Sequence, residues 1–356
     1  IEDSLTTWAK EYKIDAFRFD LMGYHPLAQS EEALKKVREV NPDMFFYAEG
    51  WDFGETAKDR RFITTTQPHT GGTGISTCSD RARDAVRGGS PFDSGAGIRK
   101  AQGFGNGAYV MPNEAVTVDA DTLDTALHQS DLTMLGMAGN LMEFTLVDKK
   151  GPPGKGEDID YNGQKAGYAV EPWEVLNYVS KHDNQSIWDN INYKVSADVS
   201  LQDRVKMQAI SIATAMLGQG IPFTDIGSEL LRSKSFERDS FDSGDWYNKV
   251  DYTLEDNNFN KGYPRSDKDQ ANYDLIESVL KTAQKPAKAD MQQMVSYFEE
   301  LTRLRKENPL LTLGKGEEVI KRVDFRNVGP NQTPGLIVMT IDDGISAGAD
   351  IDPAND

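Results

Sequence analysis

The sequence is poor in the residue types that build disulfides, histidine-rich metal centres and membrane helices. Cys78 is the single cysteine, which excludes an intrachain disulfide and a cysteine-based zinc site. The four histidines leave little room for a histidine-rich metal cluster. No apolar run approaches the roughly 18 residues that a membrane-spanning helix needs. The remaining candidates are globular proteins whose chemistry depends on other side chains.

Positive charge is also scarce. Lysine and arginine number 39 against 57 aspartates and glutamates, so the formal net charge is −18. Because phosphate backbones are bound by cationic surfaces, this balance argues against nucleic acid as the main partner. A neutral or weakly charged substrate fits it better. With 356 residues, 38% of them hydrophobic and 27% charged, the chain can bury one large core or form two domains.

The glycine-rich stretch from residue 64 to 113 lacks the signature of a phosphate-binding loop. It contains no GxxxxGK[ST] motif, and the GPPGKG sequence at 151–156 follows no strand that leads into a helix. We interpret residues 64–113 as long loops over an active-site face, with one short helix at Asp80–Arg87. The pattern therefore argues against nucleotide binding.

A strand, a helix and a second strand are predicted near the N-terminus. Ile14–Asp20 and Met44–Glu49 have the composition of buried strands, and Ser30 is the expected N-cap of the helix between them. Such a β-α-β unit makes its two strands parallel. Parallel strands end at the same edge of a sheet, and both of these end in a carboxylate.

Similar alternation continues to about residue 312. Further strands are predicted at Glu143–Val147, Val175–Ser180 and Ile221–Ile226. Helices are predicted at Asp121–Met142, Val205–Leu217 and Met291–Arg305. Ser200 and Asp203 form a capping box ahead of the helix at Val205–Leu217. Beyond them, Val319–Asn327 and Leu336–Asp342 have the pattern of two strands of a hairpin with no helix between them.

This order predicts an α/β fold: a partial (β/α)8 barrel over residues 1–312, about strands 4–8, followed by the start of a β-sandwich domain at 313–356. About five barrel strands are recognisable. We therefore expect that roughly the first three strands of the barrel, and the rest of the sandwich, belong to a longer protein.

Three acidic residues follow predicted strands: Asp20, Glu49 and Asp183. In a barrel, the C-terminal ends of the strands hold the catalytic groups, although a carboxylate in this position can equally cap a helix. Arg18 lies on the same side of its strand as Asp20, where it either keeps that carboxylate ionised or forms a structural ion pair. His182, next to Asp183, is either a ligand-binding or a hydrogen-bonded loop residue.

The neighbours of these residues decide between the alternatives. They resemble the conserved segments of the α-amylase superfamily of glycoside hydrolases, in particular its pullulanase and limit-dextrinase branch and, within it, the bacterial cell-surface type. The segments that carry the resemblance are FRFDLMGYH (17–25), YAEGWDFGE (47–55), NYVSKHDNQSIWD (177–189), GSELLRSKSFERDSFDSGDWYNKVDY (227–252) and EDNNFNKGYPRS (255–266).

The resemblance implies a retaining hydrolase of α-1,6-glucosidic bonds in pullulan, amylopectin and limit dextrins. It implies that Asp20 is the nucleophile, that Glu49 is the general acid/base and that Asp183 stabilises the oxocarbenium-like transition state. Arg18 and His182 would hold the sugar on the non-reducing side of the scissile bond.

The same resemblance implies weaker roles for three further residues. Trp51 would stack on the sugar beyond the scissile bond, although core packing is the alternative for an indole. Asn184 would orient Asp183, and Asp239 would either contact glucan or anchor its own large loop. Trp246, in the same loop, is a weaker candidate than Asp239.

No organic cofactor is implied. Structural Ca²⁺ is compatible with the acidic composition, but no compact set of ligands is recognisable. The expected partner is an α-glucan polysaccharide, and the parent protein would be secreted or displayed on the cell surface. The alternatives are an α-1,4-acting amylase, a neopullulanase or a branching enzyme of the same superfamily, and a glucan-binding fragment that is catalytically incomplete.

Overall fold

The fold is built on a parallel sheet of five strands. The computed structural model describes residues 1–344 and 348–353. The strand order is β1-β2-β3-β8-β9, and each neighbouring pair is parallel. These strands are β1 (Ala16–Phe19), β2 (Phe45–Ala48), β3 (Ile75–Cys78), β8 (Val175–Asn177) and β9 (Ile221–Pro222).

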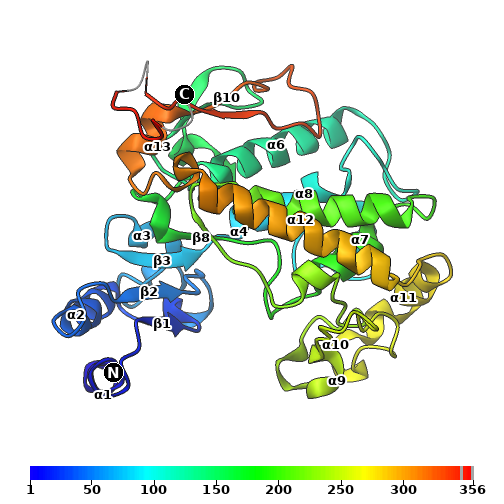
Figure 1. Ribbon diagram of the computed structural model, residues 1–356, viewed down its shortest axis with the longest axis horizontal. Coiled ribbons are helices and arrows are strands. Elements are labelled where there is room, and N and C mark those ends of the chain that lie inside the picture. Colours follow the sequence, from blue (N-terminus) through cyan, green and yellow to red (C-terminus); the bar gives the residue numbers. More distant parts are fainter. Residues whose placement is uncertain (345–347, 354–356) are drawn as a thin grey trace.

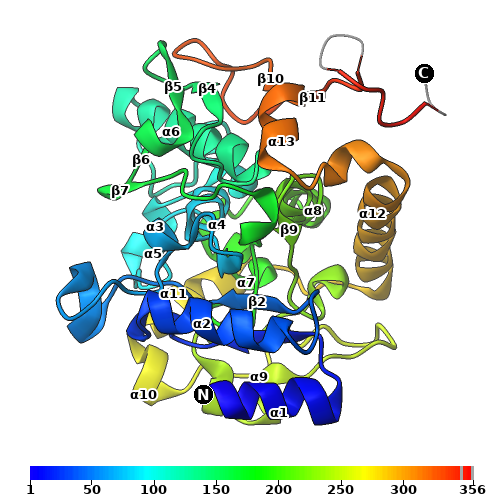
Figure 2. The ribbon, with the colours of Figure 1, turned by 90° about the vertical axis from the view of Figure 1, so that its left-hand side faces the viewer.

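The first two strands form the predicted β-α-β unit. Helix α2 (Leu27–Arg38) connects them and lies with α1 (Glu2–Tyr12) on the outside of the sheet (Figures 1 and 2). Register pairs Phe19 with Ala48, so the residue that follows each strand reaches the same edge. Val37 of α2 and Phe46 of β2 are fully buried in one core between them.

The predicted start of α2 is wrong. The helix begins at Leu27 with Pro26 as its N-cap residue, so Ser30 lies one turn inside it. Its hydroxyl lies 2.7 Å from that of Thr65 and also bonds to the Pro26 carbonyl. Pro26, whose fixed φ suits the start of a helix, takes the N-cap position. The Ser30 hydroxyl instead pairs with Thr65, a residue that is distant in sequence.

The segment 64–113 contains a strand of the main sheet, which the interpretation as loops missed. Strand β3 is buried at all four positions, between β2 and β8. Helices α3 (Gln67–Thr70), α4 (Asp80–Arg87) and α5 (Ala96–Lys100) also lie in this segment, and α4 has the predicted bounds. A strand buried on both faces shows no polar alternation, and ISTC is too short and polar to stand out.

The strand predicted at Glu143–Val147 does form but lies outside the main sheet. Its ordered part, β4 (Thr145–Val147), pairs antiparallel with β5 (Pro153–Lys155). A second small pair, β6 (Asp160–Tyr161) and β7 (Gln164–Lys165), follows. Both hairpins belong to the connection between β3 and β8. The third strand of the main sheet is therefore β3 and not the predicted strand at residues 143–147.

Long helices lie on the side of the molecule away from α1 and α2 (Figure 1). The longest are α6 (Ala120–Met137), α8 (Leu201–Met216) and α12 (Lys288–Glu307), and α8 packs against α12 and against α7 (Ile187–Lys194) (Figure 1). The predicted cap of α8 is confirmed, because Ser200 accepts a 3.1 Å hydrogen bond from the Asp203 amide. Shorter helices are α9 (Asp245–Asn248), α10 (Ser266–Asp269) and α11 (Tyr273–Leu280).

The C-terminal hairpin is shorter than predicted. Residues Gly316–Arg322 form α13, and only Val323–Phe325 (β10) pairs with Met339–Ile341 (β11), in antiparallel register. Val323 and Phe325 pack into one cluster with α6 and β8. The boundary at residue 312 stays a prediction, and residues 345–347 and 354–356 of the predicted second domain lie outside the described residues.

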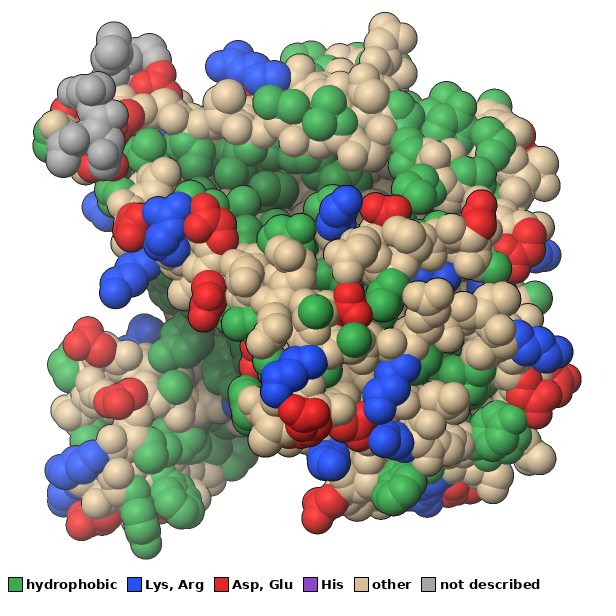
Figure 3. Space-filling model, turned by 45° about the vertical axis from the view of Figure 1, so that its right-hand side comes forward, with side chains coloured by type: hydrophobic (Ala, Val, Ile, Leu, Met, Phe, Trp, Pro, Cys, Tyr) green, Lys and Arg blue, Asp and Glu red, His purple; other side chains and the backbone are tan. Residues whose placement is uncertain are grey.

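Within the described ranges, no helix is long and apolar enough to cross a membrane. On the face shown in Figure 3, acidic and basic side chains are interspersed, and hydrophobic side chains line the hollow at the left of the view. The excess of acidic residues thus does not form one continuous acidic area on this face.

Candidate active site

The three predicted carboxylates meet at the C-terminal edge of the sheet. Asp20 follows β1, Glu49 follows β2, and Asp183 lies in the loop after β8. Their environments differ: the side chain of Glu49 is only 5% exposed, against 66% for Asp20 and 41% for Asp183. One carboxyl group is therefore shielded from water while the other two remain accessible.

Arg18 joins two of these carboxylates. Side chains alternate along a strand, so Arg18 of β1 points to the same face as Asp20. Its guanidinium lies 3.0 Å from Asp20 Oδ1 and 3.1 Å from Glu49 Oε1. The pairing of β1 with β2 brings Glu49 within its reach. Arg18 thus occupies the position from which it holds both carboxylates.

The pKa of Asp20 is lowered from its ordinary value. Burial acts to raise the pKa, but a hydrogen bond with the Glu49 carboxyl and the positive charge of Arg18 outweigh it. Burial also acts on Arg18, where the charges of Glu49 and Asp20 outweigh it and raise the guanidinium pKa. Asp20 is therefore ionised in neutral solution.

Lys181 is a central residue of the site that the sequence analysis missed. Its side chain is 5% exposed, its ammonium contacts Glu49 Oε1, and it lies 3.3 Å from Asp183 Oδ2. The site therefore contains a row of alternating charges: Asp20, Arg18, Glu49, Lys181 and Asp183. The only signal in the sequence was its position directly before His182 and Asp183.

His182 and Asn184 flank Asp183 in the same loop. His182 Nε2 lies 3.6 Å from Asp183 Oδ1, and its side chain is half exposed. Asn184 adopts a left-handed backbone conformation, with φ of 66°. Both backbone carbonyls accept hydrogen bonds from the buried ammonium of Lys234, at 2.7 and 2.6 Å. The buried lysine thus fixes the course of the loop that presents Asp183.

A cleft of about 560 Å³ opens beside the row of charges. Of the predicted residues, Glu49, Trp51, Asp183, Asn184 and Asp239 line it. Asp20, Arg18 and His182 are not part of this lining. Arg18 joins the group through its contact with Glu49, Asp20 through Arg18, and His182 through Asp183. Residues that the sequence analysis did not select also line the cleft, among them Gln67, Asp80, Arg83, Phe92 and Arg238.

Two cations lie close to the ring of Trp51. The guanidinium of Arg83 lies 5.7 Å and the ammonium of Lys181 5.8 Å from the centre of its ring, both within cation–π range. The Gly23 backbone approaches so closely that a Cβ there would lie 2.1 Å from the Trp51 carbonyl oxygen. The indole is thus held at the cleft wall rather than in the hydrophobic core.

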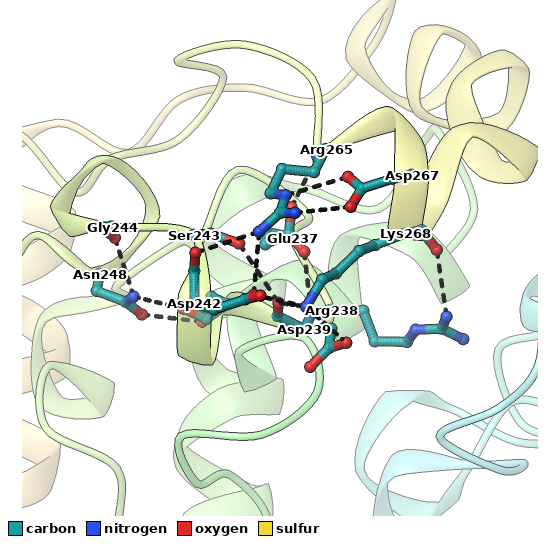
Figure 4. A network of polar contacts seen from close by, with 11 residues as sticks. Glu237, Arg238, Asp239, Asp242, Ser243, Gly244, Asn248, Arg265, Asp267 and Lys268 are labelled. Atoms are coloured by element: carbon teal, nitrogen blue, oxygen red, sulfur yellow. Dashed lines mark hydrogen bonds and ion pairs between the residues drawn. The ribbon is translucent and has the colours of Figure 1, made fainter.

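Asp239 lines the cleft from the loop that precedes α9. The network in Figure 4 fixes this loop: Lys268 lies 3.1 Å from Asp239 Oδ2 and 2.6 Å from Asp242 Oδ1. Arg265 also pairs with Asp242, at 3.0 Å. Trp246 is 60% exposed and lines a different cavity, so the structure does not place it with the carboxylates.

Candidate metal ligands do not cluster here. No group of three or more His, Cys, Asp or Glu residues with a geometry that could hold a metal ion occurs in the part of the chain that the structure describes. In the row of charges, each carboxylate already faces a cation. Two carboxyl groups that share one guanidinium can act as an acid and a nucleophile.

Comparison with known proteins shows what the chain is similar to. Residues 254–356 match the family model described as "Alpha-1,6-glucosidases, pullulanase-type, C-terminal". The chain is 55% identical over 352 residues to a pullulanase of Klebsiella pneumoniae, covering 99% of this chain and 32% of that protein. This chain is similar to pullulanases over almost its whole length. The similarity extends to plants, with 36% identity to chloroplastic pullulanase 1 of Arabidopsis thaliana over 99% of this chain and 38% of that protein.

The fold agrees as well. The crystal structure of the maltotriose complex of PulA from Klebsiella pneumoniae superimposes with a TM-score of 0.95 at 56% identity, covering 98% of this chain and 37% of that one. The chain thus spans about a third of the length of the curated pullulanases that it matches.

Proposed function

We propose that the parent protein is a debranching glycoside hydrolase that cleaves α-1,6-glucosidic bonds in pullulan, amylopectin and limit dextrins. The observation that carries this proposal is the row of alternating charges, in which two cations hold three carboxylates at one edge of a parallel sheet. The similarity to pullulanases supports the choice of substrate. The maltotriose bound to a relative supports an α-glucan ligand.

In this proposal Asp20 is the nucleophile. Its lowered pKa keeps the carboxylate ionised, and its exposed position leaves it accessible to the anomeric carbon of a bound sugar. Glu49 is the acid/base: it protonates the leaving glucosidic oxygen as Asp20 attacks, and then takes a proton from the water that releases the sugar. Asp183 stabilises the positive charge that develops on the ring.

The contact between the two carboxyl groups favours retention of configuration. Inverting enzymes separate their carboxyls by about 6.5–9.5 Å to admit a water molecule, whereas retaining enzymes bring them to about 5–5.5 Å. Asp20 and Glu49 lie close enough to share the guanidinium of Arg18, at 3.0 and 3.1 Å. A direct attack by Asp20 therefore suits this site better than attack by an intervening water.

The other predicted residues would bind or position the substrate. Trp51 offers an indole at the wall of the cleft, where it would stack on the sugar beyond the scissile bond. Arg18 and His182 would contact the sugar that Asp20 attacks. Asn184 would orient Asp183, and Asp239 would contact glucan from the opposite wall.

The five parallel strands would be part of an eight-stranded barrel whose other strands belong to the parent protein, with the hairpin of β10 and β11 starting a β-sandwich. The proposed reaction is complete with carboxyl groups and water, so it needs no organic cofactor. Structural Ca²⁺ remains compatible with the composition. Because the substrate is a polymer, the parent protein would be secreted or displayed on the cell surface.

Digestion of pullulan with sizing of the products tests the proposal. We expect maltotriose from the chain and none from its Glu49→Gln variant, since Gln cannot donate the proton. Panose instead of maltotriose would identify an α-1,4-acting neopullulanase. Binding of pullulan without release of sugar would show that the chain by itself is a glucan-binding fragment. Release that survives Glu49→Gln would overturn the assignment of the acid.

A further inference from the structure

Glu49 has two carboxyl oxygens in clearly different surroundings. Both cations of the site meet the same oxygen: Arg18 lies 3.1 Å from Oε1, and the Lys181 ammonium also contacts Oε1. Oε2 accepts a long hydrogen bond, 3.5 Å, from the Leu21 amide. Both cations therefore hold the same oxygen of the Glu49 carboxyl and leave Oε2 to other partners.

Lys181 is well placed to fix that orientation. It lies four residues after β8, and its side chain is as deeply buried as that of Glu49, each 5% exposed. Its ammonium also lies 3.3 Å from Asp183 Oδ2 and over the rings of Trp51 and Tyr178, at 5.8 and 5.9 Å. A buried ammonium with partners on several sides has little freedom to move.

From these contacts we infer that Lys181 is a positioning residue for the acid/base. It holds Glu49 through Oε1 so that Oε2 is the oxygen that gives its proton to the leaving glucosidic oxygen and later takes one from water. The same ammonium ties Asp183 to Glu49, which keeps the acid in register with the carboxylate that faces the sugar ring. This inference rests on the proposed hydrolase function and adds a residue to it.

The test compares two substrates that differ in their need for an acid. The glucosidic oxygen that leaves when pullulan is cleaved must be protonated. Fluoride leaves α-maltotriosyl fluoride with far less help from an acid. We expect Lys181→Met to lower the rate on pullulan about 100-fold or more, which is the scale of general acid catalysis. The rate on α-maltotriosyl fluoride should fall less than about tenfold. Lys181→Arg, which keeps the positive charge, should recover part of the pullulan rate.

Lys234 provides a matched control. It is also a buried lysine, and it supports the same loop, but through the carbonyls of His182 and Asn184 rather than through a carboxylate. Lys234→Met should therefore lower the two rates by the same factor. If Lys181→Met also lowers both rates equally, its role is structural and the inference is wrong.

Unfolding measurements test the contact without requiring activity. Lys181→Met, Glu49→Met and the double variant form a cycle whose unfolding equilibrium constants are measured in urea. We expect the two changes to be coupled by about tenfold, because each single change leaves a buried charge without this partner. Independent effects would overturn the inference. A chain that cleaves neither substrate but shows the coupling would lack the hydrolase activity by itself, while the contact between Lys181 and Glu49 would be supported.

Discussion

Replacing Arg18 with methionine should move the acid limb of the pH–rate profile to higher pH. Arg18 lies 3.0 Å from Asp20, and the side chains are 31% and 66% exposed, so water screens their attraction strongly. At a water-like dielectric, two unit charges about 4 Å apart attract by about 1 kcal/mol. One pKa unit corresponds to about 1.4 kcal/mol, so removal of Arg18 raises the midpoint of the acid limb by about 0.7 pH unit.

The sign follows from the proposed role of Asp20 as an ionised nucleophile. Its pKa is lowered in the folded chain, so activity persists at acidic pH and disappears as pH falls through that pKa. The assay is kcat/KM against pH with α-maltotriosyl fluoride, a substrate for which loss of acid catalysis matters little. Arg18→Lys, which keeps a positive charge, is the control and should shift the limb less. A limb that stays in place or moves to lower pH in Arg18→Met would refute the reasoning.

Three further changes have defined outcomes. Gly23→Ala would push the Trp51 backbone, which lies 2.1 Å from the added Cβ, and should lower the rate on pullulan about 10- to 100-fold; an unchanged rate would contradict the proposed role of Trp51. Ser200→Ala removes the cap of α8 and should lower the free energy of unfolding in urea by about 1 kcal/mol; no loss would mean that the cap contributes nothing. Burial raises the pKa of Asp131 to about 6, so the folded chain binds the proton more tightly than the unfolded one. The free energy of unfolding therefore falls by about 3 kcal/mol as pH rises from about 4 to above 6, and Asp131→Asn should remove this slope; a slope that persists would place the titration elsewhere.

The edge of the sheet that carries Asp20 and Glu49 was predictable because it depends on short-range order. A β-α-β unit fixes parallel strands, and parallel strands of matched register bring the residues that follow them together. Asp20 and Glu49 were identified on that basis, and the structure joins them through Arg18. The capping of α8 by Ser200 was equally local, since Ser200 and Asp203 are one turn apart.

Features that depend on distant partners were not predictable. Strand β3 forms because β2 and β8 bury it on both edges, while its own residues show no strand periodicity. Ser30 has the sequence pattern of an N-cap, but its hydroxyl pairs with Thr65, which is far away in sequence. The contact between Lys181 and Glu49 depends on the sheet, in which β3 lies between β2 and β8. Only this arrangement brings the Lys181 ammonium to Glu49.

The most direct test of the whole account is to trap the intermediate on Asp20. The Glu49→Gln variant should react with α-maltotriosyl fluoride, because this substrate needs little acid. The resulting glycosyl-enzyme intermediate should then hydrolyse slowly, because the base is absent. Mass spectrometry of the digested protein should find one maltotriosyl group, on the peptide that contains Asp20. A sugar attached to a different carboxylate, or turnover of the fluoride with inversion and no adduct, would contradict the account.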